Sequence, residues 1–179
     1  MSLILPFFTA LGAYYMIGYW MMSGTHNREP SNERIFVAIQ LYIIGVVFML
    51  LTDAQKYLVL RERRGLITHC MNGWSRNMNY LGEMMLYSSF AVLCQRNEPW
   101  YFYAVIWSVL FSLRMLTKEY SLSKKEGWPE YKRNSWPLLP KLGSNTFLSM
   151  VIYSVFFGGL FYCYSQGGFE KTAKLWLDM

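Results

Sequence analysis

Long apolar stretches that carry almost no charge are the feature of this chain that most restricts its fold. A helix that crosses a bilayer needs ~20 mainly apolar residues, with a range of about 17–25. The composition agrees, because hydrophobic residues make up 54% of the 179 and charged residues only 16%, against ~25% in soluble proteins. Five segments meet or approach the required length: Leu3–Met22, Ile35–Leu51, Tyr80–Cys94, Trp100–Leu116 and Phe147–Tyr164. We therefore predict one all-α integral membrane domain, residues 1–179, with about five transmembrane helices.

Two of these segments contain a charge, and one needs to be told apart from a targeting peptide. Tyr80–Cys94 is short and includes Glu83, and Trp100–Leu116 includes Arg114 near its end. Leu3–Met22 lacks a basic leading region and a small-residue cleavage site, so we predict a span there rather than a signal peptide.

The loop charges indicate an orientation in the membrane. With five crossings, the 53–79 loop and the 114–146 loop fall on one face, together with the N-terminus. Basic residues outnumber acidic ones in both loops, as the positive-inside rule expects. The net charge of +6 is thus explained by topology, and we expect no nucleic-acid partner.

Cysteine chemistry adds no site. Cys70, Cys94 and Cys163 lie far apart and form no Cys-x-x-Cys pair, so neither a disulfide framework nor a metal site is predicted.

The first basic loop contains signals for two helix ends. Helix-favouring residues continue from the second span through Arg64, and Gly65 is a suitable residue to end that helix. Asn79 is a plausible N-cap for the next helix. We therefore expect the second helix to extend beyond the membrane surface.

Glu83 lies one helical turn from Asn79, so the two share a face. An acid in a span is costly and usually faces a partner or a polar cavity, and Arg76 is the nearest candidate partner. We predict that Arg76, Asn79 and Glu83 converge in one polar pocket beneath the 114–141 segment. Two interpretations remain open, a structural Arg–Glu pair and a ligand site.

The second basic loop is rich in proline and aromatic residues. Pro129, Pro137 and Pro140 favour an ordered surface segment over a long helix. One interpretation is a phosphate-binding segment with a stacking Trp128 or Trp136; the other is an interfacial anchor at the headgroups. The residues available for phosphate are Lys124, Lys125, Tyr131, Lys132 and Arg133.

Three motifs, taken together, carry a resemblance. They are Q-K-x-x-x-x-R from residue 55, G-W-x-R-x-x-N-Y-L-G-E from residue 73, and K-K-x-G-x-x-x-Y-x-x-x-x-x-x-L-x-P from residue 124. The region 40–141 resembles the C-terminal half of membrane sterol reductases and steroid 5α-reductases. In that family the central motif reads R-H-P-N-Y-x-G-(D/E), and this half binds NADPH.

The resemblance implies a set of cofactor-facing positions, with Lys and Arg on phosphates, Asn and Glu on the nicotinamide amide or ribose, and aromatic rings stacking. These positions are Lys56, Arg61, Trp74, Arg76, Asn79, Tyr80, Glu83, Tyr131 and Arg133. NADPH is the implied cofactor if the site is intact, and no catalytic residue is identified.

The sequence also departs from the family pattern. Asn77-Met78 stands where the family has His-Pro, only one span precedes the matching region, and an extra span and tail occupy 142–179. Small membrane methyltransferases of the isoprenylcysteine type share a related element and a compatible size.

Much of the cofactor half is therefore present and little of the lipid-substrate half. We favour a reductase-like fold reused as an accessory subunit of a larger membrane complex, leaving open whether the chain is an enzyme. Its partners would be the lipid bilayer and other membrane subunits, in the mitochondrial inner membrane and with the respiratory chain as one candidate. The alternatives are an NADPH-dependent reductase of a sterol or other lipid C=C bond, in the endoplasmic reticulum, and a small SAM-dependent methyltransferase.

Overall fold

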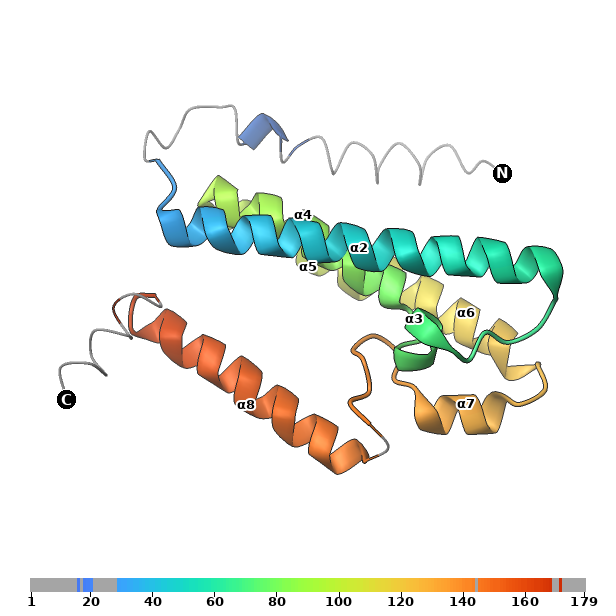
Figure 1. Ribbon diagram of the computed structural model, residues 1–179. Helices are drawn as coiled ribbons and strands as arrows, with labels where there is room; N and C mark the ends of the chain where they lie inside the picture. Colours follow the sequence, from blue (N-terminus) through green and yellow to red (C-terminus); the bar gives the residue numbers. More distant parts are fainter. Residues whose placement is uncertain (1–15, 17, 21–28, 144, 169–170, 172–179) are drawn as a thin grey trace.

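The computed structural model describes residues 16, 18–20, 29–143, 145–168 and 171. The regular elements of this part are all helical (Figure 1), which confirms an all-α membrane protein. The predicted span Leu3–Met22 falls almost entirely outside the described residues. The labelled elements are α2 (Asn32–Glu62), α3 (Cys70–Trp74), α4 (Met78–Cys94), α5 (Glu98–Ile106), the π-helix η1 (Trp107–Phe111), α6 (Ser112–Ser123), α7 (Trp128–Asn134) and α8 (Thr146–Ser165).

Three helices in the described part are long and apolar enough to cross a bilayer: α2, the continuous α5–η1–α6 helix Glu98–Ser123, and α8. They coincide with three of the predicted spans. The predicted span Tyr80–Cys94 corresponds to α4, which has 17 residues. This length is at the lower limit of ~17–25 residues for a span. As expected, α2 extends beyond its apolar stretch, ending at Glu62, slightly before the predicted end at Arg64.

The centre of the fold is the contact between α2 and α4. Two glycines, Gly45 on α2 and Gly82 on α4, face each other across it. A Cβ atom built on Gly45 would lie 2.7 Å from the Gly82 carbonyl oxygen, and one on Gly82 would lie 2.6 Å from the Gly45 carbonyl oxygen. No side chain fits there, so the two backbones touch, as small residues allow in membrane helices.

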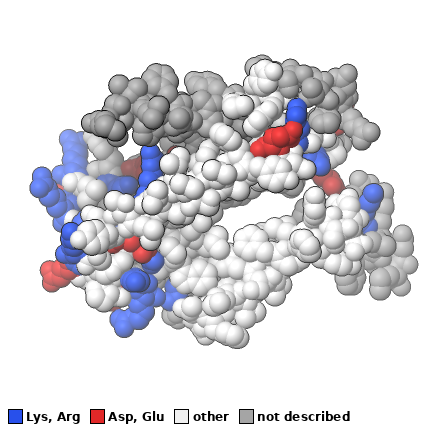
Figure 2. Space-filling model, turned by 180° about the vertical axis from the view of Figure 1, so that it is seen from behind, with Lys and Arg blue, Asp and Glu red and all other residues white. Residues whose placement is uncertain are grey.

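Both basic loops lie at the same end of the molecule, as the charge pattern predicts. The Lys125 ammonium donates to the Gly65 carbonyl at 3.0 Å, which ties the two loops together. Figure 2 shows most of the Lys and Arg side chains gathered at this end, at the left of the view. We call this end the basic face.

Helix α8 stands apart from the other helices (Figure 1) and has few contacts with them. Ser149 is its only buried residue. Its first half is held to the preceding linker, where the Tyr153 hydroxyl donates to the Pro140 carbonyl at 2.8 Å and the ring packs on Trp136. At its far end, Gly168 approaches Glu33 at the start of α2, so α8 returns to the face opposite the basic loops.

Candidate functional site

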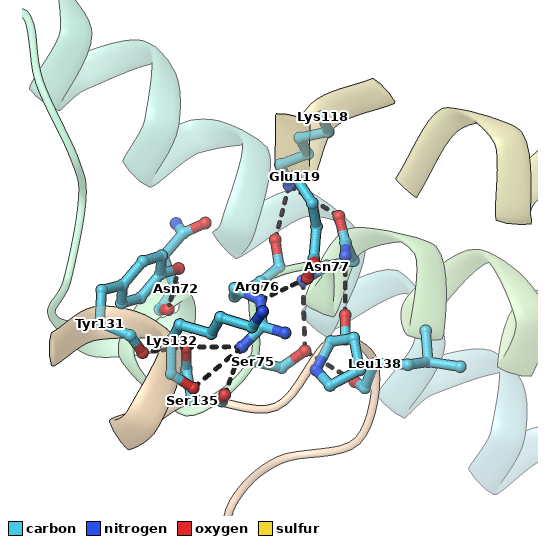
Figure 3. Close-up of polar contacts among 11 residues, drawn as sticks. Asn72, Ser75, Arg76, Asn77, Lys118, Glu119, Tyr131, Lys132, Ser135 and Leu138 are labelled. Carbon is cyan, nitrogen blue, oxygen red and sulfur yellow. Dashed lines mark hydrogen bonds and ion pairs between the residues drawn. The ribbon is translucent and has the colours of Figure 1, made fainter. Parts of the chain in front are cut away.

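A buried guanidinium, that of Arg76, lies between the start of α4, α6 and α7 (Figure 3). Arg76 is only 4% exposed. Its Nε donates to Glu119 Oε1 on α6 at 2.6 Å, and its Nη1 donates to the Ser135 carbonyl and, at 3.4 Å, to the Lys132 carbonyl. The guanidinium carbon Cζ of Arg76 also lies 5.6 Å from the centroid of the Trp128 ring. Arg76 therefore joins the start of α4 to both α6 and α7, and we call this set of contacts the Arg76 node.

The chain before α4 is paired with the chain after α7. Ser75 and Trp136 form an isolated parallel bridge, in which the Arg76 amide donates to the Trp136 carbonyl at 2.9 Å. The Lys141 amide in turn donates to the Trp74 carbonyl at 2.9 Å. The Ser75 hydroxyl adds a bond to the Leu138 carbonyl at 2.7 Å. These bonds hold residues 135–141 in an ordered, non-helical path, whereas Pro129 of the same loop lies in the first turn of the short helix α7.

Asn77 stands where the reductase family has His, and it is fully buried. Its Nδ2 donates to the Pro137 carbonyl at 2.7 Å, and its Oδ1 accepts from the Lys118 ammonium at 2.9 Å. It also precedes the first residue of α4. The expectation that Asn79 is the N-cap is thus wrong: α4 begins at Met78, and Asn79 lies in its first turn.

A second set of hydrogen bonds extends from α7 to α2. The Tyr131 hydroxyl donates to the Asn72 carbonyl at 2.7 Å, and the Gln55 amide on α2 donates to the His69 carbonyl at 2.7 Å. Asn72 Nδ2 completes the connection to Gln55 Oε1 at 3.3 Å. Burial raises the pKa of Tyr131 to about 12, because the charged phenolate is poorly solvated there. Its hydroxyl therefore remains a donor at physiological pH.

The sequence predicts that Arg76, Asn79 and Glu83 converge in one pocket, but Arg76 pairs with Glu119 rather than with Glu83. Neither Asn79 nor Glu83 lines the cavity at Arg76. Glu119 lies on the turn of α6 that faces Arg76, whereas Glu83 lies further along α4. Within the described residues Glu83 has no ion pair, although Arg114 and Asp53 are the charged groups that act on it. Asn79 Oδ1 is buried and has no hydrogen-bond partner in the part of the chain that the structure describes.

The comparisons with known proteins agree with a reductase-like membrane fold. The sequence profile of a family described as "Protein of unknown function (DUF1295)" matches residues 8–135. The chain belongs to this family. The family is associated with steroid 5α-reductase-like membrane proteins, so the match supports the resemblance at that level. No curated protein and no solved structure matches the chain.

The structure distributes the nine expected cofactor positions over separate surfaces. Lys56, Arg76 and Tyr131 line one cavity of about 70 Å³, whereas Trp74 is 56% exposed. Arg133 is exposed on α7. Lys56 and Arg61 lie on α2, and Asn79, Tyr80 and Glu83 lie on α4, the two helices in most extensive contact.

Five of the expected positions line three adjoining cavities. Lys56 and Arg61 line one cavity of about 430 Å³, and Tyr80 lines another of about 460 Å³ on α6. The Arg76 cavity between them is far smaller than the ~300–1,000 Å³ of ordinary ligand pockets, and the guanidinium is already bonded internally. No step of cofactor chemistry is therefore derived from these residues.

Sequence reasoning missed most partners of the Arg76 node. Five residues that were not predicted form hydrogen bonds or an ion pair in or beside the node: Ser75, Asn77, Lys118, Glu119 and Ser135. A possible signal was the Lys118-Glu119 pair at the end of an apolar stretch. Its partner, however, lies 43 positions away in sequence, and no local pattern indicates such a distance.

Proposed function

We propose that the chain is a non-catalytic accessory subunit of a larger membrane assembly, with a fold shared with reductases. The observation that carries the proposal is the Arg76 node. The arginine at the centre of the resemblance already contacts Glu119, Ser135 and Trp128 within the chain. Two of the three guanidinium nitrogens, Nε and Nη1, are bonded within the chain, so fewer of the five N–H donors are left for a cofactor phosphate.

Helix α8 supports the same proposal from another direction. It exposes aromatic and aliphatic side chains along its length, with Val155 at 71% and Phe161 at 73%. Gly158 and Gly159 have no atom within 4 Å of a built Cβ. Such positions allow a helix of another subunit to approach closely. In this proposal the side of α8 away from the bundle packs on a neighbouring subunit.

The proposal extends to a location. Small multi-pass subunits of this kind suit a multi-subunit energy-transducing membrane, and we propose the mitochondrial inner membrane, with the respiratory chain as the candidate complex. Separation of organelle membranes followed by detection of the tagged chain tests this part. Recovery in the endoplasmic reticulum fraction would contradict it and favour a lipid-modifying enzyme.

Two measurements test the proposed role. Calorimetric titration of the purified chain with NADPH should show no saturable binding. Gly159→Leu should leave the chain folded but shift it, on native gels after mild detergent extraction, from a large assembly to a free species. Tight NADPH binding that depends on Arg76, followed by turnover of an enone, would overturn the proposal.

One observation favours a reductase as the second candidate. Asn79 Oδ1 is buried without a partner, and buried polar groups are normally hydrogen-bonded. A bound ligand with a donor group would satisfy it. In that case NADPH should bind with micromolar-scale affinity, and Asn79→Ala should weaken binding by about 1 kcal/mol for one hydrogen bond. The same titration, repeated with this variant, separates the two candidates.

A further inference from the structure

The helix Glu98–Ser123 is longer than the hydrocarbon layer it crosses. Its 26 residues extend ~39 Å at 1.5 Å per residue, whereas the layer is ~30 Å thick. The helix begins beside the charged Arg96–Glu98 pair on the face opposite the basic loops. The excess of ~9 Å, about six residues, therefore places the end of α6, from about Lys118 onward, at the headgroups of the basic face.

An open groove with polar and apolar lining runs along α6 at this level. Arg114 lies three and four residues before Thr117 and Lys118, and Ser121 lies four and three residues after them, so all four are on one side of the helix. Together with Tyr80 of α4 and Leu113, they line a cavity of about 460 Å³. We call it the α6 groove. It combines two cations and two hydroxyls with an apolar edge at Leu113.

The charge of the α6 groove is only partly compensated. Arg114 is exposed and has no ion pair to any residue that the structure describes. Lys118 is held at the head of α4, where its ammonium donates to the Arg76 carbonyl and Asn77 Oδ1, both of which are neutral. Lys56 and Lys125 line the adjoining cavity. The carboxylates that act on these cations are Glu83 for Arg114 and Asp53 and Glu119 for Lys118.

We propose that the α6 groove binds the phosphate headgroup of an anionic phospholipid. The phosphate lies between Arg114 and Lys118, which supply charge-assisted donors, and the hydroxyls of Thr117 and Ser121 contact the rest of the headgroup. The acyl chains descend past Leu113 into the bilayer. Basic pockets between membrane helices on the cytoplasmic or matrix side are suited to such headgroups. This inference is independent of the proposed accessory role.

The location favours a lipid over a soluble anion. A cation one turn below the headgroup level meets a lipid phosphate without leaving the membrane, whereas free phosphate must compete there with the anionic lipids themselves. The mixed polar and apolar lining also matches an amphiphile. A soluble phosphate has no apolar part that could contact Leu113.

Native mass spectrometry of the purified full-length chain tests the inference. The chain is incubated in detergent with equal amounts of phosphatidylglycerol and phosphatidylcholine, and separately with inorganic phosphate. We expect one phosphatidylglycerol retained in preference to phosphatidylcholine. Arg114→Gln should weaken its retention about fivefold, since a basic residue near the membrane surface contributes ~1 kcal/mol to anionic-lipid binding.

The matched control is Lys124→Gln, which removes the same charge from the exposed end of α6 outside the groove. It should leave retention unchanged, and Arg114→Lys should restore most of it. Equal loss in Lys124→Gln and Arg114→Gln would overturn the inference, because it would show only general attraction to a basic surface. Retention of phosphatidylcholine as strong as that of phosphatidylglycerol, or equal binding of inorganic phosphate, would overturn it as well.

Discussion

The Arg76 node and α8 differ in how they are held. At the node, segments from four parts of the chain are joined by buried hydrogen bonds and an ion pair, and Arg76, Asn77, Ser75 and Ser135 are almost completely buried. Helix α8 has one buried residue, Ser149, and one end fastened to its linker. The comparison teaches that the node is stabilised from within the chain, whereas the position of α8 depends on what surrounds it.

The largest effect is expected from Arg76→Ala. It removes the partner of Glu119 and leaves the Ser135 and Lys132 carbonyls without their donor. Breaking a buried pair from one side costs about 3–5 kcal/mol, and we expect the lower end because Glu119 is 25% exposed. Thermal unfolding in detergent, followed by circular dichroism, measures the loss of stability.

Arg133→Ala is the control for this variant, because its side chain is exposed and its interaction with Lys141 uses only the main chain. It should unfold like the unmodified chain. Equal stability of Arg76→Ala and the unmodified chain would show that the node is not what holds the basic face together.

The next effect concerns the core beneath the node. In Gly82→Ala the new methyl group would lie 2.6 Å from the Gly45 carbonyl oxygen, which is backbone and cannot rotate away. Overpacking of this kind costs about 1–3 kcal/mol, so the unfolding temperature in detergent should fall. Gly158→Ala on α8 is the control, since its Cβ meets open space. An unchanged unfolding temperature of Gly82→Ala would mean that α2 and α4 are not in backbone contact.

A smaller effect is expected from Tyr131→Phe at the edge of the node. The substitution keeps the ring against Trp128 but removes the hydrogen bond to the Asn72 carbonyl. One such bond contributes ~1 kcal/mol. Chemical unfolding in detergent is sensitive enough to detect this, with Tyr120→Phe at an exposed position as the reference. No difference between the two variants would indicate that water replaces the Tyr131 hydroxyl.

The smallest effect on the chain itself is expected on α8. Gly159→Leu meets no atom within 4 Å, so the stability of the isolated chain should be unchanged or slightly higher, because Gly disfavours helix. Unfolding of the purified variant measures this directly. A clear loss of stability would mean that α8 packs on its own chain, and the contrast with the node would no longer hold.

Much of the fold was predictable because it depends on local properties. The apolar stretches that became α2, the α5–η1–α6 helix and α8 can be read as spans, since crossing a bilayer requires only length and hydrophobicity. The common face of the two basic loops follows from their charges, and the bond between Lys125 and the Gly65 carbonyl agrees with it. The expected cofactor positions remain an expectation from resemblance.

The sequence alone thus determined that the chain is an all-α membrane protein with one basic face. The tertiary structure decided which residues are partners. Arg76 pairs with Glu119 rather than with Glu83, and Gly82 of the N-Y-L-G-E element contacts Gly45. Asn77 joins the start of α4 to the proline-rich segment. These pairings depend on how distant segments cross in space, and neither hydropathy nor charge along the chain contains that information.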